Sequence, residues 1–507
     1  MINHRLLVLG SALIVALGLV SYAAAGSKSA AKRAASGSIT IALGNEPTTL
    51  DPLLQEDGNE RWVTDSIYDT LMGRSNDGKK LYPKLAAAQP KLIKKDTWEF
   101  KLRPGIKFSD GQPMNADAVV YSVNHLIDPK YNSAQIEFVG TIKTAKKVNN
   151  LTVDIITKGP DPILPSRMYW VRILPAHPAS DIASHPVGTG PYLFKEWARG
   201  DHITLTANPN YWGSPKPSIQ TITYKFVPEE GAQLAGLVSG QYDLITHLLP
   251  DEVKRAPKAI VTNGNEHPMI ILNARKGTKS VTGDVRVRQA LNYAVDKNAL
   301  AKNLFLGYAK PDAGQTLSPS WFGYDPKTKA YPYDPAKAKS LIKAAGATGK
   351  TITLEGEAGR WLNDKVMIES VAQYWREAGL KVNVQIHDFN TYLKRLFDPK
   401  NRPDAIFVST DNPLYDADRT VSAYYAPSGT GASNSDQQLQ KWIDQARTTV
   451  NVKKRLGLYH KAVERANKQA YLLWLLNTKN VWGTSTRLIW TPRLDGFMFD
   501  NTMRLKG

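Results

Sequence analysis

The 507-residue sequence contains no cysteine, and this absence excludes several kinds of chemistry. There is no disulfide framework, no thiol nucleophile, no cysteine-ligated zinc or iron–sulfur cluster, and no lipid-modified N-terminal cysteine. Long apolar runs are missing except at the N-terminus, so a polytopic membrane protein is excluded. The 36 glycines and 31 prolines are ordinary for this length, which excludes collagen-like and low-complexity chains.

Blocks of like charge are also missing, although 65 basic residues against 46 acidic ones give a net charge of +19. The basic residues occur in short pairs that are followed by apolar or acidic residues, such as Lys94-Lys95, Lys146-Lys147 and Lys453-Lys454. No nucleic-acid-binding motif accompanies them. We therefore interpret the charge as a basic surface and expect no nucleic-acid partner.

What is present at the N-terminus is typical of a secretory signal. Arg5 is followed by an apolar stretch over residues 6–20, and Ala23-Ala24-Ala25 before Gly26 forms a small-residue cleavage site. The stretch is shorter than the roughly 20 residues that span a bilayer, which disfavours the alternative of an uncleaved anchor. Residues 1–25 are therefore predicted to be a signal peptide, residues 26–37 a flexible lead-in, and the protein periplasmic.

The mature chain has the pattern of a soluble α/β protein, and its length allows two to four domains. Alternating apolar residues predict strands at 39–43, 98–102, 152–156, 203–206, 221–227 and 242–246. The second half is richer in helices. Residues 350–354, 363–378 and 381–386 predict a strand, a helix and a parallel strand, with Gly379 at the left-handed position that ends the helix. A β-rich tail at 472–490 indicates that the chain crosses between two lobes more than once, as in a hinge.

Each candidate motif for catalysis or metal binding lacks a residue that its chemistry requires. Residues 73–80 nearly match a phosphate-binding loop, but Lys80 replaces the magnesium-binding Ser/Thr, so we interpret them as a turn. The nine histidines show no metal-binding spacing, and there is no Gly-x-Ser-x-Gly elbow. Asp411, Asp416 and Asp418 lack the glycine and terminal glutamate of a calcium loop. The sequence predicts no catalytic residues, no metal site and no cofactor, and therefore no enzyme.

Several motifs together resemble a known family. They lie, in order along the chain, at residues 38–52 (SITIALGNEPTTLDP), 98–111 (WEFKLRPGIKFSDG), 116–122 (ADAVVYS), 186–192 (PVGTGPY), 208–212 (NPNYW) and 284–296 (DVRVRQALNYAVD). This series is similar to that of the family 5 extracellular solute-binding proteins, which include the dipeptide- and oligopeptide-binding components of ABC importers. The resemblance covers essentially the whole mature chain.

The resemblance implies a hinged, two-lobed periplasmic-binding-protein fold of type II with an extra subdomain. Lobe 1 would comprise residues 36–75, 186–270 and 485–507, with an inserted subdomain at 76–185, and lobe 2 would comprise residues 271–484. The ligand would bind between the lobes, near the first turn and near the loop after the strand at 405–409. The expected ligand-binding residues are Asn45, Glu46, Thr48, Arg360, Trp361, Asp411, Asn412 and Tyr415.

The sequence departs from the family in the loop after residue 409. Peptide-binding members carry an Asp-x-x-Asp-Pro-Asp pattern there, whose first aspartate accepts the ammonium group of the peptide. Here Asp416-Ala417-Asp418 fits the second half, Pro413 stands at the position of the first aspartate, and Asp411 is two residues away. We therefore do not expect strict dipeptide specificity.

Arg360 precedes the predicted helix at 363–378 and is a candidate for binding an anionic group. A guanidinium forks onto a carboxylate or phosphate, and Trp361 would stack beside it. A surface arginine paired with Asp364 at i+4 is an equally weighted alternative.

The function that these observations predict is the solute-binding component of an ABC importer. It would be a monomer that delivers a peptide-like ligand, an opine or a sugar conjugate to a membrane permease. Three alternatives stay open. A secreted hydrolase would show turnover, a chaperone-like peptide binder would show loose sequence preference, and a nickel- or haem-carrying relative would show metal or haem absorbance.

Overall fold

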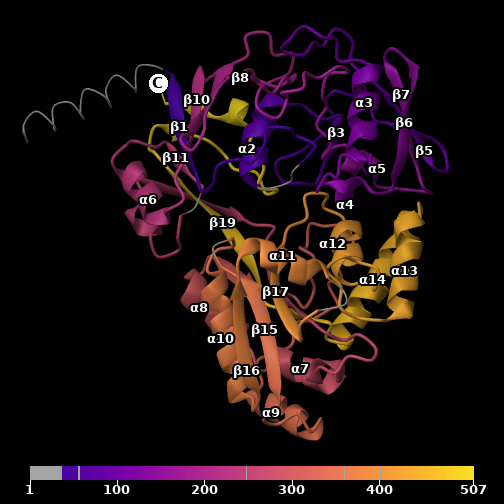
Figure 1. Ribbon diagram of the computed structural model, residues 1–507, viewed down its shortest axis with the longest axis vertical. Helices are drawn as coiled ribbons and strands as arrows, with labels where there is room; N and C mark the ends of the chain where they lie inside the picture. Colours follow the sequence, from indigo (N-terminus) through magenta and orange to yellow (C-terminus); the bar gives the residue numbers. More distant parts are fainter. Residues whose placement is uncertain (1–36, 55–57, 247, 359, 399–401, 507) are drawn as a thin grey trace, which may run out of the picture.

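The computed structural model describes residues 37–54, 58–246, 248–358, 360–398 and 402–506, and the predicted signal segment 1–25 lies outside this part of the chain. The elements gather into two bodies, an upper and a lower one, with β19 (Leu476–Thr484) running from one toward the other (Figure 1). The two bodies are mixed α/β structures, as the sequence predicts. No helix in the described ranges is long and apolar enough to cross a membrane.

The upper body is built on a sheet with the strand order β12-β19-β11-β1-β10-β9-β8. Alternate residues of β1 (Ser38–Leu43), namely Ile39, Ile41 and Leu43, are buried, which is the pattern that predicted this strand. β1 pairs in parallel with β10 and with β11. The other strands are β8 (Tyr192–Ala198), β9 (His202–Ala207), β10 (Thr221–Phe226), β11 (Leu244–Ile245) and β12 (Lys258–Asn263), with α2 (Gly58–Ile67) and α6 (Glu230–Val238) beside them.

A smaller sheet with the order β4-β5-β7-β6 lies within the sequence range expected for the subdomain. The predicted helix start is confirmed, because the Asn115 side chain accepts hydrogen bonds from the N–H groups of Asp117 and Ala118 at the beginning of α3. The elements here are β2 (Met72–Arg74), β3 (Leu81–Pro83), β4 (Lys91–Lys94), β5 (Thr97–Lys101), α3 (Ala116–Leu126), α4 (Ile136–Val139), β6 (Ile142–Asn149), β7 (Thr152–Thr157) and α5 (Leu164–Arg167).

The lower body is built on a sheet with the order β16-β15-β17-β13-β18. The predicted strand–helix–strand unit is confirmed, since β15 (Thr351–Glu357) pairs in parallel with β16 (Lys381–His387) and α10 (Asp364–Glu377) connects them. Gly379 has a φ of +107°, the left-handed conformation expected after the helix. Neighbouring residues of β13 (His267–Leu272) enter two different apolar cores, so the sheet is covered on both faces.

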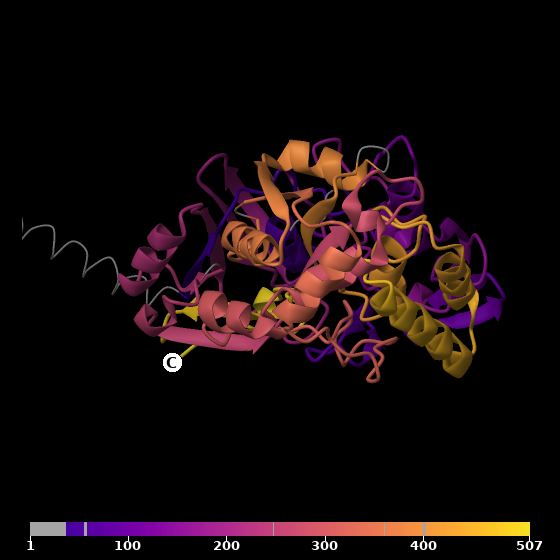
Figure 2. The ribbon, with the colours of Figure 1, turned by 90° about the horizontal axis from the view of Figure 1, so that it is seen from below.

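Helices cover these two faces. One core includes residues of α10 and the other includes residues of α13 and α14, and both views place this pair on the side away from α8 and α10 (Figures 1 and 2). The remaining elements of this body are α7 (Val285–Tyr293), α8 (Lys297–Phe305), β14 (Ala309–Pro311), α9 (Pro335–Ala344), α11 (Phe389–Phe397), β17 (Ala405–Thr410), α12 (Ala417–Tyr424), α13 (Gln437–Thr448), α14 (Val452–Lys468) and β18 (Leu472–Trp474).

The chain changes sheets between β12 and β13 and returns between β18 and β19. Both changes come earlier than the expected boundaries at 271 and 485, because β13 already pairs with β17 and β19 pairs with β12. At both points the sequence contains apolar strand residues and no local signal that marks a boundary. A short pairing of β14 with β19 ties the bodies together again, and the tail ends in β20 (Leu488–Ile489) and β21 (Arg504–Leu505).

Candidate functional site

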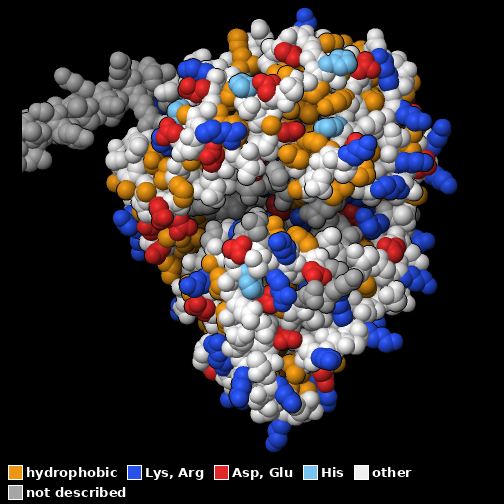
Figure 3. All heavy atoms as spheres, in the orientation of Figure 1, with side chains coloured by type: hydrophobic (Ala, Val, Ile, Leu, Met, Phe, Trp, Pro, Cys, Tyr) orange, Lys and Arg blue, Asp and Glu red, His pale blue; other side chains and the backbone are white. Residues whose placement is uncertain are grey.

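The two bodies meet at a hollow that is visible on the molecular surface (Figure 3). The first residue of β13 pairs with the last residue of β17, so these two strands end at the same edge of the lower sheet. The residues that continue these strands, Glu266 before β13 and Asp411 after β17, therefore lie at the boundary between the bodies. The candidate site is built outward from this edge.

Two carboxylates stand opposite each other at this edge. His267 pairs with Thr410 in the antiparallel ladder, so the next residues outward, Glu266 and Asp411, face each other across the strands. Burial and the charge of Asp411 raise the pKa of Glu266, while a hydrogen bond from the Ser409 hydroxyl and the charge of Arg360 lower it. Like charges in this position destabilise a strand pair, so a positive group between them would be stabilising.

The residue after Asp411 has a structural role in the loop. Asn412 is buried, and its side-chain N–H₂ donates to the backbone oxygen of Asp416 at 2.7 Å and to Thr420 Oγ1 at 3.1 Å. These bonds hold the loop against the start of α12. Asn412 therefore orders the loop, whereas the Asp411 carboxylate lies beside Glu266.

Arg360 and Trp361 lie just after β15, in the lower body. The guanidinium of Arg360 is 4.7 Å from the ring centre of Trp361, and its Nη1 is 3.7 Å from Glu357 Oε1. The Trp361 ring in turn packs edge-on against Tyr392 and Phe407, which fixes its position. The stacking beside Trp361 agrees with the sequence-based expectation, and the Arg360 side chain is 34% exposed.

The partner of Arg360 that the sequence did not single out is Glu357. Burial raises the pKa of Glu357 to about 7, against the opposing effect of the Arg360 charge. The expected partner Asp364 accepts hydrogen bonds from the backbone N–H groups of Arg360 and Trp361 at 3.1 and 3.0 Å, and so shapes the turn before α10.

The first turn of the upper body is held by contacts within that body. Glu46 accepts hydrogen bonds from Trp197 Nε1 at 2.8 Å and from the N–H of Gly200 at 3.1 Å. Both the backbone N–H and the hydroxyl of Thr48 donate to Glu60 Oε1, at 2.9 and 2.8 Å. Asn45 is exposed. Glu46 and Thr48 thus order the turn that follows β1.

Tyr415 comes from the lower body and is buried against the upper one. Its ring lies under the guanidinium of Arg74 at 5.0 Å, and Asn265 Nδ2 donates to its hydroxyl at 3.3 Å. Burial raises the pKa of the Tyr415 phenol. Tyr415 therefore contacts groups of the upper body and of the linker before β13.

The described residues contain no group of three or more His, Cys, Asp or Glu side chains arranged to hold a metal ion. Near the edge where β13 and β17 end, the charged groups include the acidic pair Glu266 and Asp411 and the cationic Arg360, whose charge acts on Glu266. Glu266 was missed in the sequence because Ser409, the residue it contacts, is 143 positions away along the chain. No local pattern marks such a pair.

Two α/β bodies joined by several crossings are the fold of solved periplasmic binding proteins, and the family model that matches this chain places it among the solute-binding proteins that serve ABC importers. More specifically, the chain belongs to the bacterial extracellular solute-binding proteins, family 5, whose family model matches residues 80–432. The sequence-based assignment to this family and to the two-lobed fold is confirmed.

The chain is similar to several characterised relatives. It is 32% identical to the glutathione-binding protein GsiB of Pectobacterium atrosepticum over 387 residues, which cover 74% of this chain and 73% of the relative. Among solved structures it resembles NikA of Brucella suis in complex with Fe(III)-EDTA, with a TM-score of 0.82, 24% identity and coverage of 92% and 100%. It also resembles the periplasmic binding protein DppA of Helicobacter pylori in complex with the peptide STSA, with a TM-score of 0.79, 23% identity and coverage of 93% and 98%.

Proposed function

We propose that the chain captures a small peptide-like ligand that carries both an ammonium group and an anionic group. The observation that carries this proposal is the opposed pair of carboxylates, Glu266 and Asp411, with the Arg360 guanidinium in the same body. A ligand ammonium would relieve the repulsion between the carboxylates. The guanidinium would form a charge-assisted hydrogen bond with a ligand carboxylate, in competition with Glu357.

Glutathione is the first compound to test, because a relative with 32% identity is a glutathione-binding protein. At neutral pH glutathione carries an ammonium group and two carboxylates, which matches the charges at the boundary. Its ammonium belongs to a γ-linked residue, which is compatible with the departure from the dipeptide pattern at Pro413. We expect neither strict dipeptide specificity nor chemical conversion of the ligand.

The two bodies would act as lobe 1 and lobe 2 of a hinged binder that closes on its ligand. The lobe boundaries would follow the sheets, with the changes between β12 and β13 and between β18 and β19 as the hinge. The first turn, with Asn45, Glu46 and Thr48, would form the wall on the side of lobe 1. Trp361, Asn412 and Tyr415 would complete the site on the side of lobe 2.

The protein would act as a periplasmic monomer that hands its ligand to an ABC permease, without nucleic acid. We expect the exported protein to begin at Gly26, after the small-residue site at Ala23–Ala25. Intact mass of extracytoplasmic material would show residues 1–25 removed. Retention of these residues would contradict cleavage of the signal.

A thermal-shift screen tests the ligand class directly. The compounds are glutathione, simple dipeptides, opines and a nickel–histidine complex, each against the purified mature chain. A ligand present at 100 times its dissociation constant stabilises the folded state by about 2.7 kcal/mol. We expect glutathione or a closely related peptide to raise the melting temperature, and a response to the nickel complex alone would contradict the proposal.

A further inference from the structure

Residues 414–419 of the lower body, here called the latch segment, are packed into the upper body. Leu414 is 1% exposed and lies in the core that otherwise unites upper-body residues such as Ile39, Phe100 and Trp170. Among the described residues between 269 and 476, Leu414 is the one that enters this core. The latch segment therefore links the two bodies by apolar burial.

Arg74 of the upper body clamps the same segment. Its Nη2 donates to the backbone oxygen of Leu414 at 3.0 Å, and its Nη1 donates to the backbone oxygen of Gly78 at 2.8 Å. The ring of Tyr415 occupies the space over Gly78, where an added Cβ would come within 1.9 Å of the ring. Tyr415 has a φ of +55°, a conformation that a tyrosine adopts only where its surroundings impose it.

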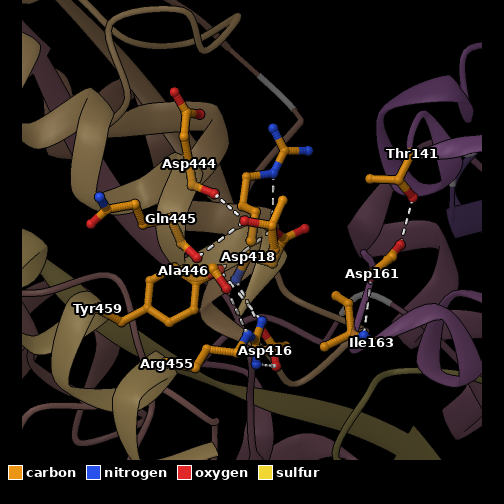
Figure 4. Close-up of polar contacts among 12 residues, drawn as sticks. Thr141, Asp161, Ile163, Asp416, Asp418, Asp444, Gln445, Ala446, Arg455 and Tyr459 are labelled. Atoms are coloured by element: carbon orange, nitrogen blue, oxygen red, sulfur yellow. Dashed lines mark hydrogen bonds and ion pairs between the residues drawn. The ribbon is translucent and has the colours of Figure 1, made fainter. Parts of the chain in front are cut away.

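An ion pair crosses the boundary three residues further on. Arg167 Nη2 of α5 lies 2.6 Å from Asp418 Oδ2 of α12, and the two side chains are 3% and 4% exposed. Figure 4 shows Asp418 on the lower body across from Asp161 on the upper body. Arg419 follows, with its guanidinium 5.0 Å from the ring centre of Phe138 in α4. Leu414, Tyr415, Asp418 and Arg419 of the latch segment thus contact the upper body.

Each member of the ion pair also has an oppositely charged partner within its own body. In the upper body, Arg167 Nε is 2.7 Å from Asp161, whose carboxylate also accepts a hydrogen bond from Thr141 Oγ1 at 2.6 Å (Figure 4). In the lower body, Arg447 Nε donates to Asp418 Oδ1 at 3.1 Å.

The turn that carries Asp418 is itself fixed by an ion pair. Arg455 forks onto Asp416 with distances of 2.7 and 2.5 Å (Figure 4). Separation of the bodies would consequently leave Arg167 paired with Asp161 and Asp418 paired with Arg447. Because each side chain would keep an oppositely charged partner, the contact between Arg167 and Asp418 can form and break reversibly.

We propose that the latch segment holds the two lobes closed through contacts of the protein with itself, and that Arg167, Leu414 and Asp418 are positioning residues for ligand capture. A ligand bound between lobes needs the closed form, so its apparent dissociation constant is the intrinsic value divided by the closed fraction. The latch raises that fraction. Weakening it raises the dissociation constant of every ligand by the same factor, whereas a residue that contacts ligand changes the ratio between ligands.

The absence of cysteine allows a direct measurement of closure. Lys94→Cys and Lys441→Cys place spin labels at exposed positions of the upper and lower body, and pulsed electron paramagnetic resonance then gives the distance between them. In the ligand-free protein, we expect Asp418→Asn, Arg167→Gln and Leu414→Ala each to shift this distance toward longer values. The Asp418→Asn/Arg167→Gln double variant should open no further than the stronger single variant, because both changes remove one contact.

Titration with glutathione gives the second readout. We expect Asp418→Asn to raise the dissociation constant at least tenfold, mainly through faster dissociation, and by the same factor for γ-glutamylcysteine. The matched control is Arg447→Gln, which removes the partner that Asp418 keeps inside the lower body when the bodies separate, and it should not lengthen the ligand-free distance.

The ligand-free distance also separates this inference from the proposed ligand. If glutathione does not bind the wild type, the ligand proposal is wrong. The distances between the spin labels in the ligand-free protein still test whether the latch segment holds the lobes closed. Unchanged distances in Leu414→Ala and in Asp418→Asn, with the protein folded, would overturn the latch. A different change in affinity for the two peptides would overturn it as well, because it would place Asp418 in contact with ligand.

Discussion

Arg167 and Arg360 both lie in the region where the two bodies meet, and both are paired with carboxylates, yet their surroundings differ. Arg167 is 3% exposed and held by Asp161 at 2.7 Å and Asp418 at 2.6 Å. Arg360 is 34% exposed, and Glu357, its paired carboxylate, is 3.7 Å away and has a pKa raised to about 7. The first arginine is buried between two carboxylates of the protein, and the second is the one for which we propose a ligand partner. Side-chain burial is therefore the difference between the two arginines on which the predictions below depend.

The largest expected effect is on stability at Arg167. Arg167→Ala would leave Asp161 buried without its cation and would remove one of the cations beside Asp418, and removing one partner of a buried pair costs about 3–5 kcal/mol. Urea denaturation should show this loss. If the free energy of unfolding fell by less than about 1 kcal/mol, as expected at an exposed arginine, the proposed difference between Arg167 and Arg360 would be wrong.

The next effect is on affinity at Arg360. In Arg360→Ala we expect glutathione binding to weaken by about 2–5 kcal/mol if the ligand carboxylate is desolvated in the closed cleft, and the stability of the protein to fall by less than about 1 kcal/mol. Arg360→Lys keeps the charge and loses the fork, so its affinity should be intermediate. Titration calorimetry against wild type measures both. Wild-type affinity in the two variants would remove Arg360 from the site.

A third effect is the pH dependence of stability. Burial raises the pKa of Glu357 to about 7, and burial also raises the pKa of Asp500 to about 7. The folded protein therefore keeps these protons where the unfolded chain has lost them, so the free energy of unfolding falls as pH rises from about 4.5 to about 7. The contribution of each group is on the order of 3 kcal/mol, since one pKa unit corresponds to about 1.4 kcal/mol.

Variants separate the two groups in this pH range. Glu357→Gln should remove one part of the slope and Asp500→Asn the other, in denaturation curves measured between pH 5 and pH 8. In Arg360→Ala the falling part should extend to higher pH, because the Arg360 charge lowers the pKa of Glu357. An unchanged slope in Glu357→Gln would show that this carboxyl is ionised throughout.

The smallest effect is expected at Arg286, which pairs with Asp284 at 2.6 Å on the surface of the lower body. Arg286→Ala should change neither glutathione affinity nor the thermal midpoint measurably, because exposed pairs contribute little. It serves as the control for Arg360→Ala. A loss of affinity at Arg286 would mean that net positive charge, and not the position of Arg360, attracts the ligand.

The sequence predicted local features of the fold well and long-range features poorly. The β15–α10–β16 unit follows from apolar periodicity and from Gly379, which are properties of neighbouring residues. The points where the chain changes sheets were placed too late, because β13 and β19 are apolar strands in either body. The body to which a strand belongs depends on its pairing with distant strands, and the pattern of a single sequence does not reveal that pairing.

The candidate site shows the same limit. Arg360 and Trp361 were recognisable as a cation beside an aromatic ring because they are neighbours in sequence. Glu266 was not, because its contact with Ser409 spans 143 positions, and the pairing of Arg167 with Asp418 spans 251. The Asp416-Ala417-Asp418 motif was noticed as half of a family pattern, but its role in binding Arg455 and Arg167 depends on the tertiary fold.

The most direct test of the account is a titration of the mature wild-type protein with glutathione, with N-acetylglutathione and with the C-terminal amide of glutathione. The acetyl derivative lacks the ammonium that Glu266 and Asp411 would hold, and the amide lacks one of the carboxylates available to Arg360. We predict that glutathione binds and that the acetyl derivative binds at least tenfold more weakly, with a loss in Asp411→Asn that is smaller for the acetyl derivative than for glutathione. Equal affinity for glutathione and N-acetylglutathione would contradict recognition of an ammonium group between the two carboxylates.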